Sequence, residues 1–150
     1  MPQSLSKVYV HLTFSTKNRK SDIAPEFQDR LFQYLGGICS GLDCIPIQIG
    51  GYRDHVHLLL LLSRKIAQMK LVEELKKNSS KWIKSIDEQF ANFYWQDGYG
   101  IFSVNPTEKN IVVEYIKNQE EHHKTKSFQD EFRAFLKKYH IEYDERYVWD

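Results

Sequence analysis

Two histidines stand one residue apart at the start of an apolar run, within the stretch from Gly51 to Leu62. Side chains alternate along a strand, so His55 and His57 are expected to point to the same face of a sheet. Two imidazoles on a rigid strand form half of a site for a divalent metal ion. A complete metal site needs further ligands from elsewhere in the chain.

A second pair of chemically useful side chains lies later in the chain, on a segment with helical spacing. Tyr115 and Gln119 are four residues apart and therefore share one helix face. The Gln119 amide oxygen is a candidate third ligand, and two imidazoles with an amide oxygen suit Mg²⁺ or Mn²⁺. A tyrosine has an ordinary pKa of about 10, so it attacks a phosphate more readily when a metal polarises that phosphate.

Apolar periodicity predicts the elements that position these side chains. The expected strands span 7–16, 44–50, 56–62 and 99–104, and the expected helices span 25–41 and 66–86. This order is β-α-β-β-α-β, which predicts an α+β, ferredoxin-like fold. Such a fold has an antiparallel sheet with two helices on one face.

Spacing also predicts two details of packing. Ile45, Ile47 and Ile49 alternate along the second strand, so they are expected to face one way. The buried stripe of the second helix is expected to contain Met69, Val72, Leu75, Ser79, Trp82 and Ile86.

The rest of the chain is expected to cover the other face of the sheet. Asn105, Pro106 and Glu108 form a helix start, and that helix should continue to about His122. Ser127 can cap a further helix, and the aromatic tail should dock. We therefore expect one domain over 1–150, with a ferredoxin-like core at 1–104, a tyrosine helix at 105–123, and a C-terminal helix and tail at 124–150.

Composition sets broad limits on the class of protein. The chain has 150 residues, of which 41% are hydrophobic, so we expect a folded domain rather than a disordered chain. The net charge of +1 does not by itself indicate that the protein binds nucleic acid. The N-terminal residues are polar and no apolar run is long enough to span a membrane, so we expect a cytoplasmic protein with Cys39 and Cys44 reduced.

The sequence resembles a known protein family. His55-Val56-His57, followed by Tyr115 to Gln119 on a later helix, is similar to the single-tyrosine HUH transposases of small bacterial insertion sequences, which include REP-associated relatives. HUH denotes a histidine, a hydrophobic residue and a histidine. The segments 11–19, 95–104, 120–123 and the tail from residue 139 also resemble that family.

The resemblance implies an activity, a cofactor and partners. Tyr115 would cleave single-stranded DNA, form a 5′-phosphotyrosine and release a 3′-hydroxyl that later rejoins strands. His55, His57 and Gln119 would hold Mg²⁺ or Mn²⁺. The protein would be a bacterial or archaeal homodimer that acts at the nucleoid on hairpins at the ends of its element, with the tyrosine helix serving its own or the partner's histidines.

Further residues are candidates for supporting roles. His11 and His122 are expected to line the site. The basic residues expected to contact DNA phosphates are Lys17, Arg19, Arg53, Lys77, Lys81 and Lys84. Solvated surface is an equal expectation for these basic residues.

Three other readings of the sequence stay open. A ferredoxin-like sheet can bind single-stranded RNA by stacking bases on exposed aromatic residues, although here the corresponding face carries His55 and His57. A two-histidine phosphoesterase would need two separate histidine motifs, and the chain has one His-x-His. A relative that binds DNA without cleaving it is the third possibility.

Overall fold

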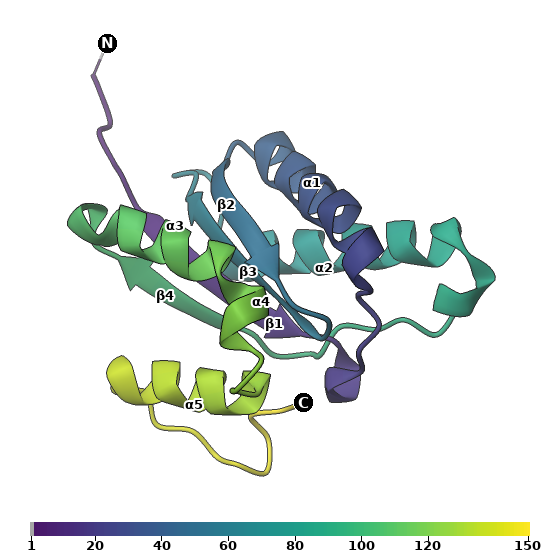
Figure 1. Ribbon diagram of the computed structural model, residues 1–150. Helices are drawn as coiled ribbons and strands as arrows, with labels where there is room; N and C mark the ends of the chain where they lie inside the picture. The colour runs from purple at the N-terminus through teal and green to yellow at the C-terminus, as the bar shows by residue number, and fades with distance from the viewer. Residues whose placement is uncertain (1) are drawn as a thin grey trace.

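In the computed structural model, which describes residues 2–150, a four-stranded antiparallel sheet lies between two groups of helices (Figure 1). The strands are β1 (Tyr9–Ser15), β2 (Ile45–Gly51), β3 (His55–Leu61) and β4 (Gly100–Val104), and their order in the sheet is β2-β3-β1-β4. Helix α1 (Pro25–Gly41) connects β1 to β2, and α2 (Gln68–Ile86) connects β3 to β4. The predicted ferredoxin-like α+β fold is confirmed.

The two central strands are buried on both faces because a helical layer covers each face. Alternate residues of β1 and β3 pack against α1 and α2 in the main core; these are Val10, Leu12, Phe14, Val56, Leu58 and Leu60. The intervening residues point to the opposite face. The register places His55 beside Ser15 and His57 beside Thr13, so both histidines are held on that opposite face by two neighbouring strands.

The opposite face is covered by the C-terminal third of the chain, shown in green and yellow in Figure 1. Its elements are a 3₁₀ turn η3 (Pro106–Glu108), α3 (Lys109–Lys117), α4 (Gln119–His122) and α5 (Phe128–Lys138). The single helix expected from 106 to 122 is therefore interrupted. Asn118 is the break, because its φ of −97° and ψ of 21° depart from regular helical values.

The expected caps and tail in this region are present. The Ser127 hydroxyl oxygen accepts a hydrogen bond from the Asp130 backbone N–H at the start of α5. The tail returns to the body of the protein, where the Trp149 ring packs against Phe132. In the part of the chain described, no helix is long and apolar enough to cross a membrane. Both cysteines are buried and free.

Two packing details differ from the expectation. Met69 is 72% exposed because it lies on the solvent side of α2, and Leu71 and Ile83 join Val72, Leu75 and Ser79 in the buried stripe instead. In β2, the register shifts between Pro46 and Gln48. This bulge reverses the alternation of side chains, so Ile47 packs toward α3 while Ile49 packs toward α1 and α2.

Helix α3 crosses β2 at a glycine, and this contact gives a testable prediction. A Cβ on Gly50 would lie 2.8 Å from both Cγ2 and the carbonyl oxygen of Ile116, one residue after Tyr115. Gly50→Ala should therefore lower the free energy of unfolding by about 1–3 kcal/mol, because the helix must shift to accommodate the methyl group. Denaturant unfolding measures this change.

Gly37 provides the matched control for that measurement. It lies inside α1, and a Cβ at this position meets nothing within 4 Å. Gly37→Ala should raise the free energy of unfolding by about 0.5–1 kcal/mol, since alanine is the better helix former. Equal stability of Gly50→Ala and the wild-type protein would contradict the close approach of α3 to β2.

Candidate active site

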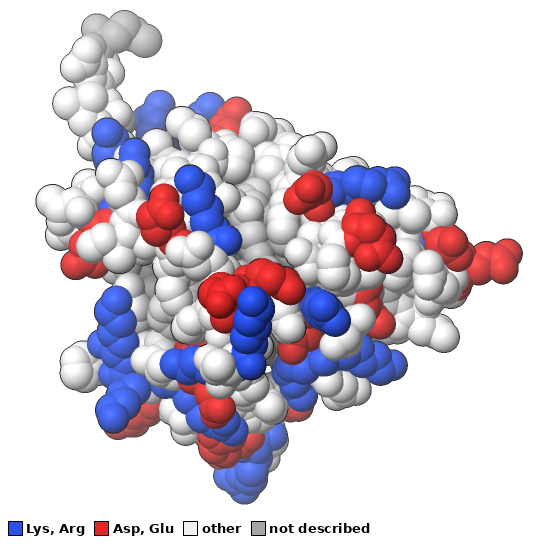
Figure 2. All heavy atoms as spheres, viewed as in Figure 1, with Lys and Arg blue, Asp and Glu red and all other residues white. Residues whose placement is uncertain are grey.

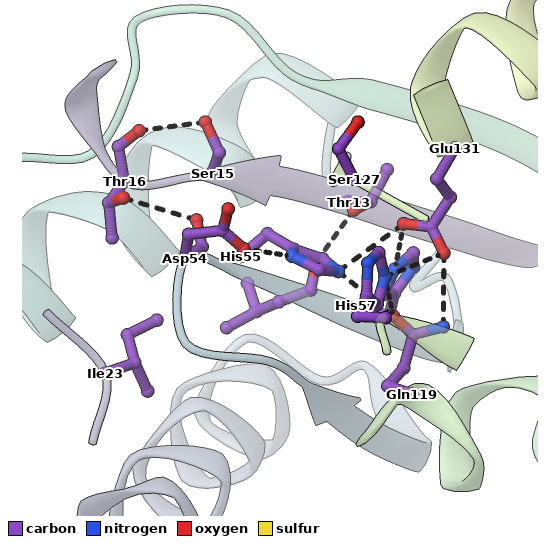
Figure 3. Close-up of polar contacts among 12 residues, drawn as sticks. Thr13, Ser15, Thr16, Ile23, Asp54, His55, His57, Gln119, Ser127 and Glu131 are labelled. Carbon is purple, nitrogen blue, oxygen red and sulfur yellow. Dashed lines mark hydrogen bonds and ion pairs between the residues drawn. The ribbon is translucent and has the colours of Figure 1, made fainter. Parts of the chain in front are cut away.

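The histidine pair lies at the start of β3, under the C-terminal helices. Both side chains are fully buried, and both point toward Gln119 on α4 and Glu131 on α5 (Figure 3). The strand positions them because the preceding turn ends at His55 and the leucines that follow anchor β3 in the core. The structure thus brings His55, His57 and Gln119 together, as the sequence predicted, and adds Glu131.

A third histidine completes the cluster. The Nε2 atoms of His55 and His123 lie 3.0 Å and 2.9 Å from Oε1 of Gln119. Oε1 of Glu131 lies 2.9 Å from Nε2 of His57 and 3.4 Å from Nε2 of His55, and its Oε2 lies 3.3 Å from Nε2 of His123. Three imidazole nitrogens therefore face three oxygens in one buried space.

The outer nitrogens of two of these imidazoles are already occupied. Nδ1 of His55 donates to Asp54 at 2.7 Å, and Nδ1 of His123 donates to the Lys126 backbone oxygen at 2.6 Å. A neutral imidazole that donates from Nδ1 presents a lone pair at Nε2. Fixing of the outer nitrogen by a carboxylate or backbone oxygen is the usual arrangement around metal-ligating histidines.

The donor set fits a divalent metal ion. Ligand atoms of His55, His57, His123 and Glu131 all lie within 4.8 Å of one another. A cation placed between these atoms would be attracted by lone pairs of the imidazole nitrogens and by the oxygens of Gln119 and Glu131. Imidazole nitrogen together with carboxylate and amide oxygen is a combination that Mn²⁺ and similar ions accept. We conclude that this cluster can bind a divalent metal.

His11 supports the pair from β1. Its Nε2 lies 2.8 Å from Nδ1 of His57, so one ring donates to the other. Burial, and then the nearby His57, lower the pKa of His11 to about 3. Burial likewise lowers the pKa of His57, against the opposing effect of Glu131. Both rings are therefore neutral at physiological pH, the state in which an imidazole can act as a ligand.

Tyr115 points into the same cluster from α3. Its ring lies 5.8 Å from the His57 ring, and its hydroxyl donates a hydrogen bond to the Glu131 carboxylate. Nε2 of His122 is 3.3 Å from the same hydroxyl oxygen. Burial, and then the charge of Glu131, raise the pKa of Tyr115 above its ordinary value. The nucleophile predicted from sequence thus lies beside the predicted histidines of its own chain.

Glu131 carries the negative charge of the site. Burial alone would raise the pKa of this carboxyl group, but its contacts with His57 and His123 outweigh burial and hold the pKa below its ordinary range. Contact with Glu131 in turn raises the pKa of His123, despite its burial. The carboxylate is therefore ionised and shared by several donors.

Sequence reasoning missed His123 and Glu131. His122, which was expected to line the site, is 31% exposed and lies beside Tyr115, while the adjacent His123 faces the histidine pair. Glu131 left a readable signal, because it lies among Phe128, Phe132 and Phe135 on the apolar face of α5. A lone acidic residue on such a face needs polar partners.

The predicted DNA contacts fall into two groups. Lys77, Lys81 and Lys84 line one cavity of about 580 Å³, together with the exposed Tyr94. The structure places Lys17, Arg19 and Arg53 elsewhere, where the Arg19 guanidinium donates to the Trp149 backbone oxygen and Arg53 lies over the Tyr52 ring. On the face seen in Figure 2, basic and acidic side chains are interspersed. The six roles remain predictions.

The cavity lined by Lys77, Lys81 and Lys84 of α2, called the α2 cavity below, lies at the same end of the sheet as the histidine pair. Gln96 lines the cavity, and its side-chain oxygen accepts a hydrogen bond from the Ser15 backbone N–H. Ser15 is the register partner of His55. The three lysines belong to the helical layer on the other side of the sheet from the histidine pair.

Residues 4–119 match the family described as "Transposase IS200 like". The fold is similar to a structure of a candidate transposase from Deinococcus radiodurans R1, with a TM-score of 0.62 and 23% identity over 79% of this chain and 98% of that one. It is also similar to a REP-associated tyrosine transposase bound to a REP hairpin, with a TM-score of 0.60 and 16% identity over 82% of this chain and 73% of that one. Among curated proteins, none matches the chain.

The family match contains both histidines of the pair, Tyr115 and Gln119, and it ends before His123 and Glu131. It spans well over half of the sequence, from the residues before β1 to the first residue of α4. The fold, which was reached separately from the strand and helix pattern, is shared with the two solved structures. The protein therefore belongs to the IS200-like transposase family.

Proposed function

We propose that this transposase cleaves and rejoins single-stranded DNA through a covalent bond between Tyr115 and a 5′ phosphate. The observation that supports this most directly is the position of the Tyr115 hydroxyl, which lies in the cluster formed by the histidine pair of the same chain. A tyrosine next to metal-binding imidazoles has the parts needed for nucleophilic attack on a phosphodiester.

His55, His57 and Gln119 would hold a divalent ion, Mg²⁺ or Mn²⁺, with His123 and Glu131 as additional donors. When bound, such an ion polarises a phosphate group and positions it for attack. Asp54 orients His55 through Nδ1, and His11 orients His57 in the same way. Burial of the cluster excludes water, which would otherwise compete with the tyrosine as nucleophile.

The proposed cleavage step conserves the phosphodiester. The Tyr115 hydroxyl oxygen attacks phosphorus and loses its proton, for which His122 Nε2, 3.3 Å away, is an acceptor in place. The bond from phosphorus to the 3′ oxygen breaks, and that oxygen takes up the proton from His122 and leaves as a 3′-hydroxyl. In rejoining, a 3′-hydroxyl attacks the phosphotyrosine, its proton passes to the tyrosine oxygen, and the Tyr115 hydroxyl is restored. Each step exchanges one phosphodiester for another, so no nucleotide cofactor is needed.

The proposed DNA partner is a hairpin at the ends of an insertion element, and the proposed assembly is a homodimer. The relative described as bound to a REP hairpin shares this fold, which supports a hairpin as the ligand. The α2 cavity offers positive charge for the backbone and Tyr94 as a stacking surface for a base. The Lys84 ammonium lies 4.2 Å from the centre of the Tyr94 ring and keeps that ring in place.

The lysines of the α2 cavity give a salt-dependent prediction. The double variant Lys81→Ala, Lys84→Ala should weaken binding of single-stranded DNA, and each lost phosphate contact should reduce the slope of log affinity against log salt by about 0.7. Fluorescence anisotropy at several salt concentrations measures this slope. Lys65→Ala is the control, because Lys65 is exposed and lies outside the cavity. An unchanged slope would exclude this cavity from the DNA path.

The covalent intermediate tests the proposed function. The protein is incubated with Mn²⁺ and with labelled single-stranded oligonucleotides that tile the flanks of its reading frame, then run on a denaturing gel. A labelled band at the mass of protein plus DNA, lost when the metal is chelated with EDTA, is the expected result. Absence of this band with every oligonucleotide would eliminate the phosphotyrosine mechanism.

The non-enzymatic alternative, stacking of single-stranded RNA on the sheet, has less structural support. The face that carries His55 and His57 is covered by α3, α4 and α5 (Figure 1), and the residues of β1 and β3 that point to it are mostly buried. Bases therefore have no open sheet surface on which to stack.

A further inference from the structure

Helix α5 presents three side chains to the active site from one face. Phe128, Glu131 and Phe135 follow helical spacing, and the outer two are aromatic. The Phe128 ring lies 4.7 Å from the His55 ring, and the Phe135 ring lies 5.2 Å from the His11 ring. Glu131 reaches between them to the histidine pair, which is fully buried. The helix thus covers the site with two rings and fills it with a carboxylate.

Glu131 lies between the histidines and Tyr115, where the proposed mechanism requires a substrate phosphate. Its two carboxylate oxygens contact Nε2 of His55, His57 and His123, and one of them also accepts a hydrogen bond from the Tyr115 hydroxyl. A carboxylate and a phosphodiester are both anions with adjacent oxygens, so they satisfy the same donors. The Tyr115 hydroxyl is therefore hydrogen-bonded to Glu131 of its own chain and is not free to attack a phosphorus atom.

The proposed metal ion has too few coordination positions to bind all of these protein donors and a phosphate at the same time. Mg²⁺ and Mn²⁺ favour six ligands in octahedral arrangement. His55, His57 and Gln119 would leave room for several phosphate and water oxygens, whereas His123 and Glu131 fill much of that room. Binding of a phosphodiester in the proposed mechanism requires that some of these protein donors leave. Glu131 is the donor that most resembles the phosphate in charge and shape.

We propose that α5 is an autoinhibitory lid and that Glu131 is its latch, which holds the site closed until DNA displaces the carboxylate from the histidines and from Tyr115. This inference rests on the proposed function, since it concerns access of DNA to the same site. The lid lies outside residues 4–119, the part of the chain that matches the family.

The lid is held from outside by the C-terminal tail. Arg133 on α5 pairs with Glu145, and the Trp149 indole N–H donates to the same carboxylate group at 3.0 Å. The Arg19 guanidinium, from the other end of the chain, donates to the Trp149 backbone oxygen at 2.7 Å. These contacts are partly or fully exposed, so each contributes little and can open separately. Opening of the lid then requires loss of the tail contacts and of the Glu131 contacts together.

The first test uses inorganic phosphate as the probe and does not depend on DNA. Wild-type protein, Glu131→Ala and the control Asp130→Ala are loaded with Mn²⁺, and water-proton relaxation reports how many water molecules remain on the bound ion. Asp130 is the control because it lies on α5 next to Glu131 but pairs with Arg133 on the surface. Glu131→Ala should show more water on the ion and bind phosphate about tenfold tighter, the gain expected when an intramolecular competitor is removed.

Three results of the phosphate test would overturn the latch. Glu131→Ala and the wild-type protein could bind phosphate equally, Asp130→Ala could behave as Glu131→Ala does, or Glu131→Ala could lose Mn²⁺ altogether. The last result would make Glu131 a required ligand. Glu131→Gln is measured alongside, since it keeps the size of the side chain and removes its charge. Thermal melting of each variant shows whether the fold is retained.

The second test is the adduct assay with single-stranded oligonucleotides from the flanks of the reading frame. Release of the latch should make Glu131→Ala and Glu131→Gln form the Tyr115 adduct about tenfold faster than the wild-type protein. Slower adduct formation by both variants would overturn the latch. If no protein forms an adduct, the proposed function fails, and the phosphate test still decides whether Glu131 closes the site.

Discussion

Tyr115→Phe is expected to form no covalent adduct with single-stranded DNA, a loss on the order of a thousandfold or more, because the variant lacks the attacking oxygen. The phenylalanine ring keeps the packing of Tyr115 against His57 and Phe135, so the fold should persist. Loss of the hydrogen bond to Glu131 should cost about 1 kcal/mol of stability. Denaturing gels measure the adduct, and thermal melting measures the stability.

Tyr34→Phe is the matched control for that substitution. Tyr34 lies on α1, on the far side of the sheet from the histidine pair, and its ring stacks on Trp82. This variant should form the adduct at the wild-type rate. Persistence of an adduct in Tyr115→Phe would mean that another residue is the nucleophile, and mass spectrometry of the linked peptide would identify it.

His57→Ala is expected to lose cleavage by about a thousandfold while largely retaining its affinity for a DNA hairpin. His57 is fully buried, and it contacts His11 through one nitrogen and Glu131 through the other. Its removal takes one ligand from the proposed metal site, so Mn²⁺ affinity should also fall, by about a hundredfold. Calorimetry with Mn²⁺ and anisotropy with a labelled hairpin separate these effects.

The buried position of His57 requires a control for folding. His57→Gln keeps a polar side chain near His11 and Glu131, and thermal melting of both variants shows whether loss of the imidazole unfolds the site. His140→Asn is the matched exposed histidine, outside the cluster, and should cleave at the wild-type rate. Collapse of hairpin binding in a folded His57→Ala protein would assign His57 a structural role and not a role in cleavage.

The fold could be predicted from local patterns because each strand and helix has its own periodicity. Alternation in β1 and the apolar run in β3 identified the two central strands, and the short connection between β2 and β3 predicted that they pair. Two of the errors occurred where local geometry departs from the regular period. The bulge after Pro46 and the break at Asn118 each change the direction of the side chains that follow.

The candidate site could be predicted only in part. Some of its residues share one strand or one helical turn, whereas others meet only through tertiary packing. His55 and His57 share one strand, and Tyr115 and Gln119 share one helical turn, so spacing alone placed each pair on one face. Glu131 reaches the cluster only through the turn at 123–127 and the packing of α5 on Phe102. Such tertiary placement depends on contacts between distant residues, which periodicity does not encode.

The break at Asn118 divides the active site into two mechanical parts. Ile116 packs α3 closely against Gly50 of the sheet, and this contact holds the neighbouring Tyr115 next to the imidazoles of β3. Gln119, directly after Asn118, contacts His55, and Glu131 follows on α5, which is a separate helix. Because Tyr115 and α5 do not share one continuous helix, the proposed opening of α5 would leave the Tyr115 hydroxyl at the histidine pair. The break thus separates the position of the proposed nucleophile from the movement of the proposed lid.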